Sequence, residues 1–352
     1  WGDLLGVDRV GIHDNFFELG GHSLLATQVA ARLRSRTQKT LAIRDLMAEP
    51  TIAALAAKLD RGAGATEQTP LLRVDRQQQL PLSFAQQRLW LLDQIEGTLA
   101  YSVPSVLRVR GPLDESLLQQ AVAAVCNRHE GLRTVFPMVD DTPCQQILPE
   151  QDWPLPLTDV RESADSDDLQ ALEAEARRLL AIDLLTPFDL ATGPLFRCRL
   201  LRLGERDHIF LLNIHHIVTD GWSMNLLVRD LATAYLQLSL YGQVQWQPLP
   251  IQYVDFAVWQ RQRLDPARRR ELSAYWQQQL AAVEPLALPT DFPRPAIQTF
   301  AGASQRFTLS AATRAALQQH ATAANTSLFA ALMSGFFILL RQYSGQDDFC
   351  IG

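Results

Sequence analysis

The apolar residues of this chain recur at two spacings, one typical of strands and one typical of helices. Residues 208–214 form a mostly apolar run, which predicts a buried strand. Residues 194–203 form a second strand pattern, and a short polar segment, 204–207, separates the two. We therefore expect an antiparallel hairpin, followed by a helix over 223–240.

Helical spacing covers much of the remaining chain. We expect further helices over 24–36, 51–59, 114–129, 168–180 and 253–263, and from about 311 and 328. One more strand is predicted over Arg306–Leu309. From about 60 to 79 the periodicity fades into small and polar residues, the composition of a linker.

Composition excludes several classes of protein. The 352 residues include 47% hydrophobic and 20% charged residues, which suits two globular domains or one large one. The net charge of −6 argues against a general nucleic-acid binder, because phosphate contacts need an excess of basic residues. No apolar run is long enough for a membrane span, and no signal peptide opens the chain. The four cysteines show no metal-ligand spacing and indicate reduced thiols, so we expect a cytoplasmic protein with no metal site.

The strongest candidate for chemistry is HHIVTDG at residues 215–221, between the predicted strand and the predicted helix. Consecutive strand side chains point to opposite faces, so one of His215 and His216 should pack inside while the other can face a cavity. A histidine on an apolar strand is more often a packed core residue, but a pair followed by Asp-Gly is less easily accidental. Asp220 can cap the helix or hold a cation. Gly221 allows a positive φ or a close backbone approach.

Two other segments carry polar groups in informative places. Ser23 follows Gly20-Gly21-His22 at the start of a predicted helix, where free N–H groups and the helix dipole favour an anion such as a phosphate ester. An ordinary serine N-cap fits the same position, so the helix start alone leaves both roles open. The dense charges of 128–133, just before an apolar segment, suggest an ion-pair network that orders a turn.

Taken together, these segments resemble known family motifs. HHxxxDG at 215–221 resembles the signature of the chloramphenicol-acetyltransferase-like superfamily, and its extension to Ser223 resembles the condensation domain of nonribosomal peptide synthetases. Residues 83–90, 128–136 and 253–259 resemble further condensation-domain motifs, in the family's order. The string DNFFELGGHSLL, which contains Ser23, resembles the core motif of a peptidyl carrier protein.

The resemblance implies a fold and a domain order. Residues 1–60 would form a small α-helical bundle, the carrier, with its first helix truncated, and 61–79 a linker. Residues 80–352 would form an α/β chloramphenicol-acetyltransferase-like condensation domain, with the first lobe and the start of the second. The late family motif is not present and both ends read as cut, so we expect an excerpt of a longer polypeptide.

The resemblance also implies a reaction. A donor acyl or peptidyl thioester, held by 4′-phosphopantetheine on Ser23, would be joined to the amine of an aminoacyl thioester on a downstream carrier domain. His216 would take or guide the proton of the amine, while His215 and Asp220 support the loop. Gly221 would bring its backbone N–H near the reacting centre. The implied partners are a phosphopantetheinyl transferase, an upstream adenylation domain and the downstream carrier.

Three alternatives share parts of this pattern. An epimerisation domain also has HHxxxDG, and a non-catalytic recruitment domain of the same fold usually lacks an intact histidine motif. A stand-alone acyltransferase that uses coenzyme A is disfavoured by the fused carrier. No epimerisation domain lies between carrier and condensation domain, and His22 stands where carriers that precede epimerisation domains often have Asp. The resemblance therefore implies an L-configured donor residue.

Overall fold

The computed structural model describes residues 1–351 except 22, 38, 40, 42, 61–69, 97–98, 165–167, 297–301 and 325, and it leaves out the side chains of residues 23, 24, 34, 35 and 96. The chain divides into two compact units. The first contains Trp1–Gln68 and Ala274–Gly352, and the second contains Thr69–Ser273. The helix α10 (Pro266–Gln279) contains the boundary between them.

The N-terminal part of the first unit is helical, with α1 (Gly2–Leu5), α2 (Ser23–Thr37), α3 (Ile43–Ala48) and α4 (Ile52–Asp60). A small core joins these helices, and its buried members are Phe16, Ala26, Val29, Leu41, Leu46 and Leu55. Phe16 is completely buried, and Gly21 lies so close to it that a side chain at residue 21 would collide with the ring. Packing therefore requires glycine at residue 21, because only glycine permits this approach, whereas Gly20 has a positive φ of 93°, which glycine adopts without strain.

The C-terminal part of the first unit contains α11 (Ala311–Ala323) and α12 (Leu328–Ser344), at the positions predicted from the sequence. The strand predicted over Arg306–Leu309 is wrong, because these residues have no regular secondary structure and pair with no other described strand. The Phe307 side chain is 82% exposed. An alternating pattern alone does not make a strand, since a strand also needs a hydrogen-bonding neighbour.

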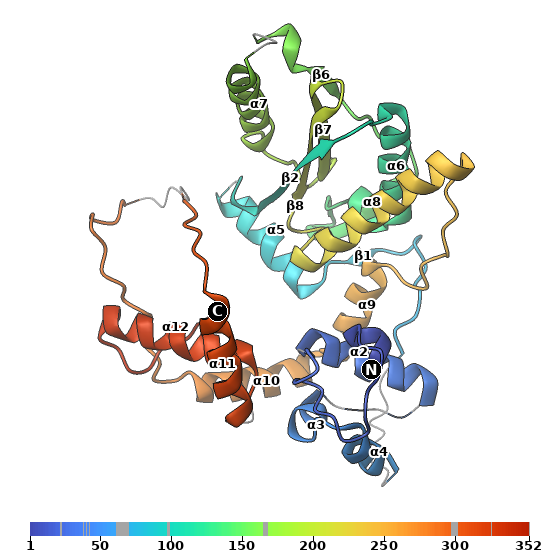
Figure 1. Cartoon of the computed structure of the whole chain (residues 1–352). Coiled ribbons are helices and arrows are strands. Elements are labelled where there is room, and N and C mark those ends of the chain that lie inside the picture. The colour runs from blue at the N-terminus through green and yellow to red at the C-terminus, as the bar shows by residue number, and fades with distance from the viewer. Residues whose placement is uncertain are drawn as a thin grey trace. The chain divides into compact units, whose positions relative to one another are not determined.

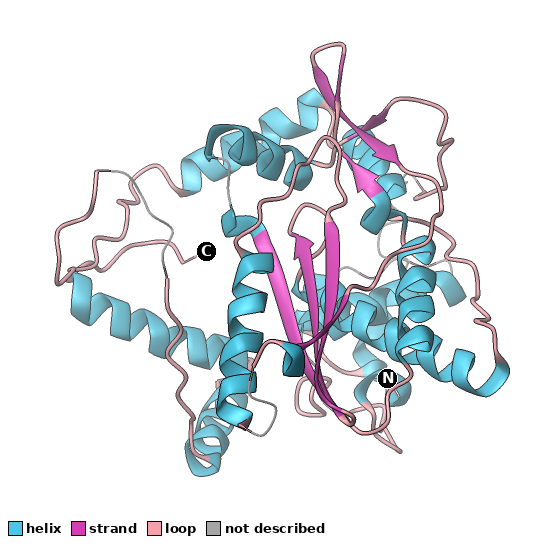
Figure 2. Ribbon diagram, turned by 90° about the horizontal axis from the view of Figure 1, so that it is seen from above, coloured by secondary structure: helices cyan, strands magenta, loops and turns pink. Residues whose placement is uncertain are grey.

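The second unit is built on a four-stranded sheet in the order β2 (Ser102–Arg110), β8 (Asp207–His215), β7 (Phe196–Gly204) and β6 (Leu157–Asp159) (Figure 1). β7 and β8 form the predicted antiparallel hairpin, whereas β6 is parallel to β7. Figure 2 shows the long strands side by side. Strand β8 is central, so its C-terminal end is held by pairing on both edges.

Helices cover both faces of this sheet. One core cluster joins α6 (Glu115–Arg128) and α8 (Gly221–Tyr241) to the face of Phe210 and Ile214. A second cluster joins α7 (Leu169–Leu184) to the opposite face through Leu211. These packed layers hold the end of β8 and the start of α8 in fixed positions.

Shorter elements complete the second unit. A small sheet contains β1 (Leu80–Pro81), β5 (Thr142–Ile147), β3 (Thr134–Val135) and β4 (Met138–Val139). Two helices, α5 (Phe84–Glu96) and α9 (Tyr253–Arg263), and three 3₁₀ turns, η1 (Leu99–Tyr101), η2 (Glu130–Arg133) and η3 (Val160–Glu162), complete it. The N-terminal ends of α5 and α9, with η1 and η2, lie around the end of β8 and supply side chains to the site described next.

Across the described residues, no single helix has both the length and the apolar character of a membrane span. One bent pair, α11 with α12, meets the criteria on length and composition alone.

Candidate active site

The two adjacent histidines at the end of β8 have different environments. His215 is the last residue of the strand and only 1% of it is exposed, whereas His216 is exposed. Strand alternation predicts that His216 lies on the face of Phe210, Leu212 and Ile214, and this is wrong. The strand ends one residue earlier, and the His216 N–H donates to the Tyr101 carbonyl at 2.7 Å as the backbone turns.

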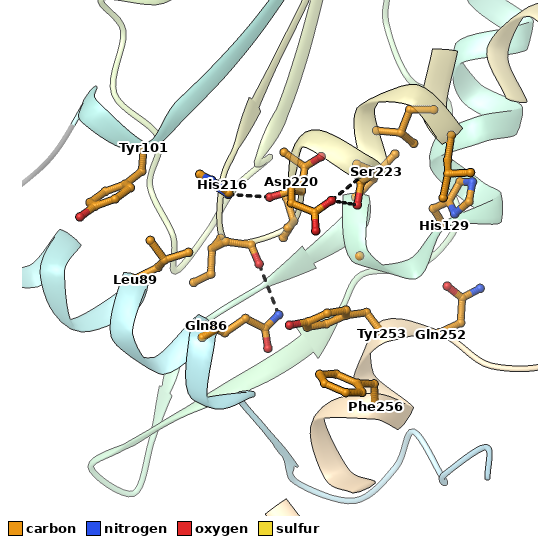
Figure 3. A pocket seen from close by; sticks show the side chains of 18 of the residues that line it. Gln86, Leu89, Tyr101, His129, His216, Asp220, Ser223, Gln252, Tyr253 and Phe256 are labelled. Carbon is orange, nitrogen blue, oxygen red and sulfur yellow. Dashed lines mark hydrogen bonds between the residues drawn. The ribbon is translucent and has the colours of Figure 1, made fainter. Parts of the chain in front are cut away.

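The turn presents the His216 ring to a cavity of about 560 Å³. Its Nδ1 lies 2.7 Å from the Thr219 carbonyl oxygen, which can only accept a hydrogen bond. Nδ1 therefore carries the proton, and Nε2 keeps its lone pair in the neutral ring. Figure 3 shows this contact at the edge of the cavity. The arrangement leaves one imidazole nitrogen free to accept a proton from a ligand.

His215 has the opposite environment. Its Nδ1 accepts a hydrogen bond from the Ile217 N–H at 3.1 Å, and its ring packs near those of Tyr101 and Phe188. Burial, with a smaller contribution from the charge of His216, lowers the pKa of His215 to about 4. A neutral, buried imidazole that accepts from the backbone supports the turn.

The buried His215 should make the folded state sensitive to mild acid. The unfolded chain takes up the proton near pH 6.5 and the folded chain only near pH 4, so protonation favours unfolding in this window. We expect the free energy of unfolding to fall by about 2 kcal/mol more in the wild type than in His215→Asn between about pH 7 and about pH 5. Urea unfolding at the two pH values measures the difference. Equal pH dependence in both proteins would contradict the buried neutral ring.

Asp220 is the N-cap of α8. Its Oδ1 accepts from the Ser223 N–H at 2.7 Å and from the Ser223 hydroxyl at 2.6 Å. Partial burial opposes ionisation, but these hydrogen bonds outweigh it and lower the pKa of Asp220 below its usual value. The capping role, one of the two expected from the sequence, is therefore present. The described residues contain no group of three or more His, Cys, Asp or Glu side chains that could hold a metal.

Gly221 is the first residue of α8, and the structure is compatible with only one of the two reasons expected for a glycine there. Its φ is not positive, and no atom lies within 4 Å of the position that a side chain would take. The expectation of a positive φ is wrong, whereas the open space leaves room for the close backbone approach that was also expected.

Four other elements, α5, α9, η1 and η2, and the loop before α9 supply the walls of the cavity. Most of the lining is apolar with a few polar groups, as in sites for small molecules. The Gln86 amide donates to the Ile217 carbonyl at 3.4 Å and so supports the histidine turn from α5. The Tyr253 hydroxyl lies 3.0 Å from Ser83 Oγ and ties α9 to the start of α5. Sequence reasoning placed both segments in motifs but did not identify these contacts.

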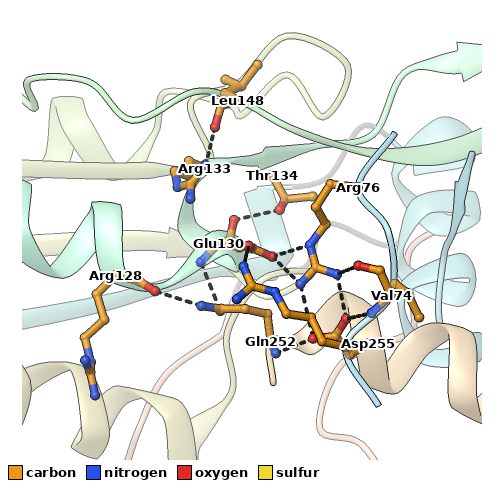
Figure 4. Close-up of polar contacts among 10 residues, drawn as sticks. Val74, Arg76, Arg128, Glu130, Arg133, Thr134, Leu148, Gln252 and Asp255 are labelled. Atoms are coloured by element: carbon orange, nitrogen blue, oxygen red, sulfur yellow. Dashed lines mark hydrogen bonds and ion pairs between the residues drawn. The ribbon is translucent and has the colours of Figure 1, made fainter. Parts of the chain in front are cut away.

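The ion-pair network predicted for residues 128–133 is confirmed, and Figure 4 shows the part of it around Glu130 and Arg76. Glu130 pairs with Arg76 at 2.9 Å and Asp230 pairs with Arg128 at 3.3 Å, while His129 Nε2 is within hydrogen-bond distance of Asp230 at 2.9 Å. Sequence reasoning missed Arg76, because it lies in the stretch predicted to be linker. The one available signal was its charge within a segment poor in periodic apolar residues.

The second candidate, Ser23, is the first residue of α2, one position before the predicted helix start. Its side chain, and all of His22, lie outside the described residues. The backbone of α2 still places Ser23 at the N-terminus of a 15-residue helix. A phosphate ester at this position would meet the free N–H groups of the first turn, so the site fits the predicted group.

Comparisons with known proteins bear on both candidates. A family model described as Condensation domain matches residues 76–352, and one described as Phosphopantetheine attachment site matches residues 1–59. These matches cover the histidine turn and Ser23 respectively.

The curated relatives are large peptide synthases. The chain is 42% identical over 355 residues to a linear gramicidin synthase of Brevibacillus parabrevis, with 100% of the chain and 7% of that protein covered. It is 41% identical over 357 residues to a dimodular nonribosomal peptide synthase of Bacillus subtilis (strain 168), with 99% and 15% covered. The chain thus spans a small part of the relatives that it matches.

Solved structures agree on the fold. A complex of the X-domain and OxyB from teicoplanin biosynthesis matches with a TM-score of 0.68 and 29% identity, over 80% of this chain and 61% of that one. The first condensation domain of the calcium-dependent antibiotic synthetase matches with a TM-score of 0.62 and 24% identity, over 76% and 62%. At 24% identity, the match to the condensation domain of the calcium-dependent antibiotic synthetase is evidence for the fold alone.

Proposed function

The chain belongs to the condensation-domain family of nonribosomal peptide synthetases, with a phosphopantetheine-attachment domain ahead of it, and from this premise we propose that it forms an amide bond during peptide assembly. The carrier holds the donor acyl or peptidyl thioester. The condensation domain joins the donor to the amine of an aminoacyl thioester that a downstream carrier delivers. The observation that carries the proposal is the His216 ring at the cavity, with Nδ1 anchored and Nε2 free.

The reaction requires that the amine and the thioester be positioned and that the amine proton be removed. The amine attacks the thioester carbonyl as a neutral nucleophile, the new C–N bond forms, and the amine proton must leave before the thiol departs. His216 Nε2 is the group in the cavity suited to accept or guide that proton. His215 stays neutral and holds the turn, while Asp220 fixes the start of α8. Gly221 leaves room beside the turn for its backbone N–H to meet the substrate.

Ser23 is the proposed attachment point of 4′-phosphopantetheine. When bound, this group supplies the thiol that carries the donor as a thioester. The N-terminus of α2 would hold its phosphate. A phosphopantetheinyl transferase would install it, and an upstream adenylation domain would select and load the donor. The direct order of carrier and condensation domain, with His22 beside Ser23, supports an L-configured donor.

A second function has one observation in its favour. The likeness to the X-domain, solved in complex with OxyB, supports a domain that recruits another protein instead of catalysing a reaction. The complete histidine turn, with His216 exposed in a cavity, supports the condensation reaction instead. A recruitment domain has no need of a free imidazole nitrogen at that place.

Mass spectrometry of the product separates these functions. The synthetase that contains this segment is loaded with a donor on its own carrier and supplied with a soluble aminoacyl thioester. Condensation predicts a dipeptidyl thioester with an unchanged donor configuration. A D-configured donor would indicate epimerisation, and a loaded protein that yields no dipeptide would leave recruitment as the better account.

A further inference from the structure

The second half of the predicted linker is part of the second unit. We call residues 70–79 the strap. The Val74 N–H donates to Asp255 Oδ1 at 2.8 Å, and the Arg76 Nη1 donates to the Val74 carbonyl at 2.7 Å. Both the backbone and a side chain of the strap are thus bound, which is not expected of a free linker.

Arg76 bridges two carboxylates on different elements (Figure 4). Its Nη1 and Nη2 bind the two oxygens of Asp255 at 2.6 and 3.1 Å, and its Nε binds Glu130 Oε2 at 3.0 Å. Asp255 is completely buried and Glu130 is only 7% exposed. The planar guanidinium can serve both partners at once because its donors lie in a fixed fork.

Both carboxylates belong to elements that line the cavity. Asp255 lies in α9, which contributes Tyr253 and Phe256 to the lining, and Glu130 begins η2, which contributes Gly131 and Leu132. Arg76 itself does not line the cavity. Arg76 can therefore affect the cavity only through α9 and η2, the two elements that it joins.

Gln252 links α9 directly to η2 by hydrogen bonds, and we call this contact between the two elements the seam. Its N–H donates to Asp255 Oδ2 at 2.7 Å, and its side-chain oxygen accepts from the Glu130 N–H at 3.2 Å. Its side-chain amide donates to the Arg128 carbonyl at 2.9 Å. Gln252 also lines the cavity, so a shift of either element changes the cavity wall.

We propose that Arg76 is a positioning residue that fastens the strap to the seam between α9 and η2 and so holds the cavity walls in place for the amine acceptor. This inference rests on the proposed function. Without Arg76, two buried carboxylates would face each other, and Arg73, which is 63% exposed and 3.7 Å from Glu130, would be the nearest remaining cation to Glu130 among the described ion pairs. Like charges in such a setting drive the two elements apart.

The test uses the full synthetase with a donor loaded on its own carrier, so that only the acceptor concentration varies. Arg76→Lys keeps the positive charge but loses the bidentate contact with Asp255. We expect it to raise the KM for a soluble aminoacyl thioester by about five-fold or more and to change kcat by less than about two-fold, because loosened walls weaken binding before they affect the chemistry. The matched control, Arg73→Met, removes a more exposed arginine of the strap and should change KM by less than about two-fold.

Hydrogen exchange gives a readout that does not depend on turnover. In Arg76→Lys, the amides of Val74 and Gln252 should exchange at least about ten times faster, while those of β8 exchange as in the wild type. Arg76→Met should show the same change more strongly, and Arg76→Lys carries the test if the Met variant fails to fold. Unchanged exchange would overturn the fastening itself. Faster exchange with an unchanged KM would overturn the positioning role, whereas a wild type that forms no dipeptide would refute the proposed function and leave the exchange result standing.

Discussion

His216→Ala will lower the rate of amide formation by about 10²–10⁴-fold, the range typical for loss of a general acid–base group. The ring is exposed at the cavity and makes one described hydrogen bond, from Nδ1 to the Thr219 carbonyl, so its removal should leave the core of the second unit intact. The single-turnover rate of dipeptidyl product, followed by mass spectrometry on a preloaded carrier, measures the effect.

His216→Asn is the matched control. The asparagine amide can take the place of Nδ1 as the donor to the Thr219 carbonyl, but it offers no basic nitrogen. We expect the Asn and Ala variants to be similarly slow. An Asn variant that retains nearly the wild-type rate would mean that the ring serves only to hold the turn.

Ser23→Ala will abolish product formation from a donor that must be loaded on the protein itself. Alanine has no hydroxyl to form the phosphate ester, so the donor thioester is never presented at high local concentration to the condensation domain. Incubation with a phosphopantetheinyl transferase and coenzyme A should add the mass of the arm to the wild type and add nothing to the variant.

A donor supplied in solution provides the control for Ser23→Ala. A short-chain thioester of the same donor reaches the cavity without the carrier. The variant and the wild type should then form dipeptide at equal, slow rates, because the histidine turn is unchanged. If the variant is inactive with the soluble donor as well, Ser23 has a role beyond attachment. If it still gains the arm, another residue is the attachment point.

The sequence alone predicted the elements that depend on local pattern. The hairpin of β7 and β8 and the start of α8 follow from apolar alternation and its interruption. The unlike environments of His215 and His216 were also predicted, although β8 ends before His216 and alternation is not their cause. The ion pairs around Glu130 were also expected, because charge that dense needs partners at a turn.

Other features depend on tertiary contacts that a local pattern does not contain. The strand predicted over Arg306–Leu309 does not form, since no described neighbour pairs with it. The position at which β8 ends also depends on a distant segment, because the last inter-strand contact is from the His216 N–H to the Tyr101 carbonyl, a residue more than a hundred positions away. The role of Arg76 was not predicted, because its partners Glu130 and Asp255 lie far along the chain.

The bound strap has a practical consequence for anyone who recombines synthetase modules. A graft that exchanges the carrier by cutting just before Leu80 would discard Arg76 and Val74 together with the donor's carrier, and the recipient would inherit two uncompensated carboxylates. A cut within 61–69 leaves these contacts with their own domain. We expect chimaeras joined upstream of residue 70 to keep turnover that chimaeras joined at residue 79 lose.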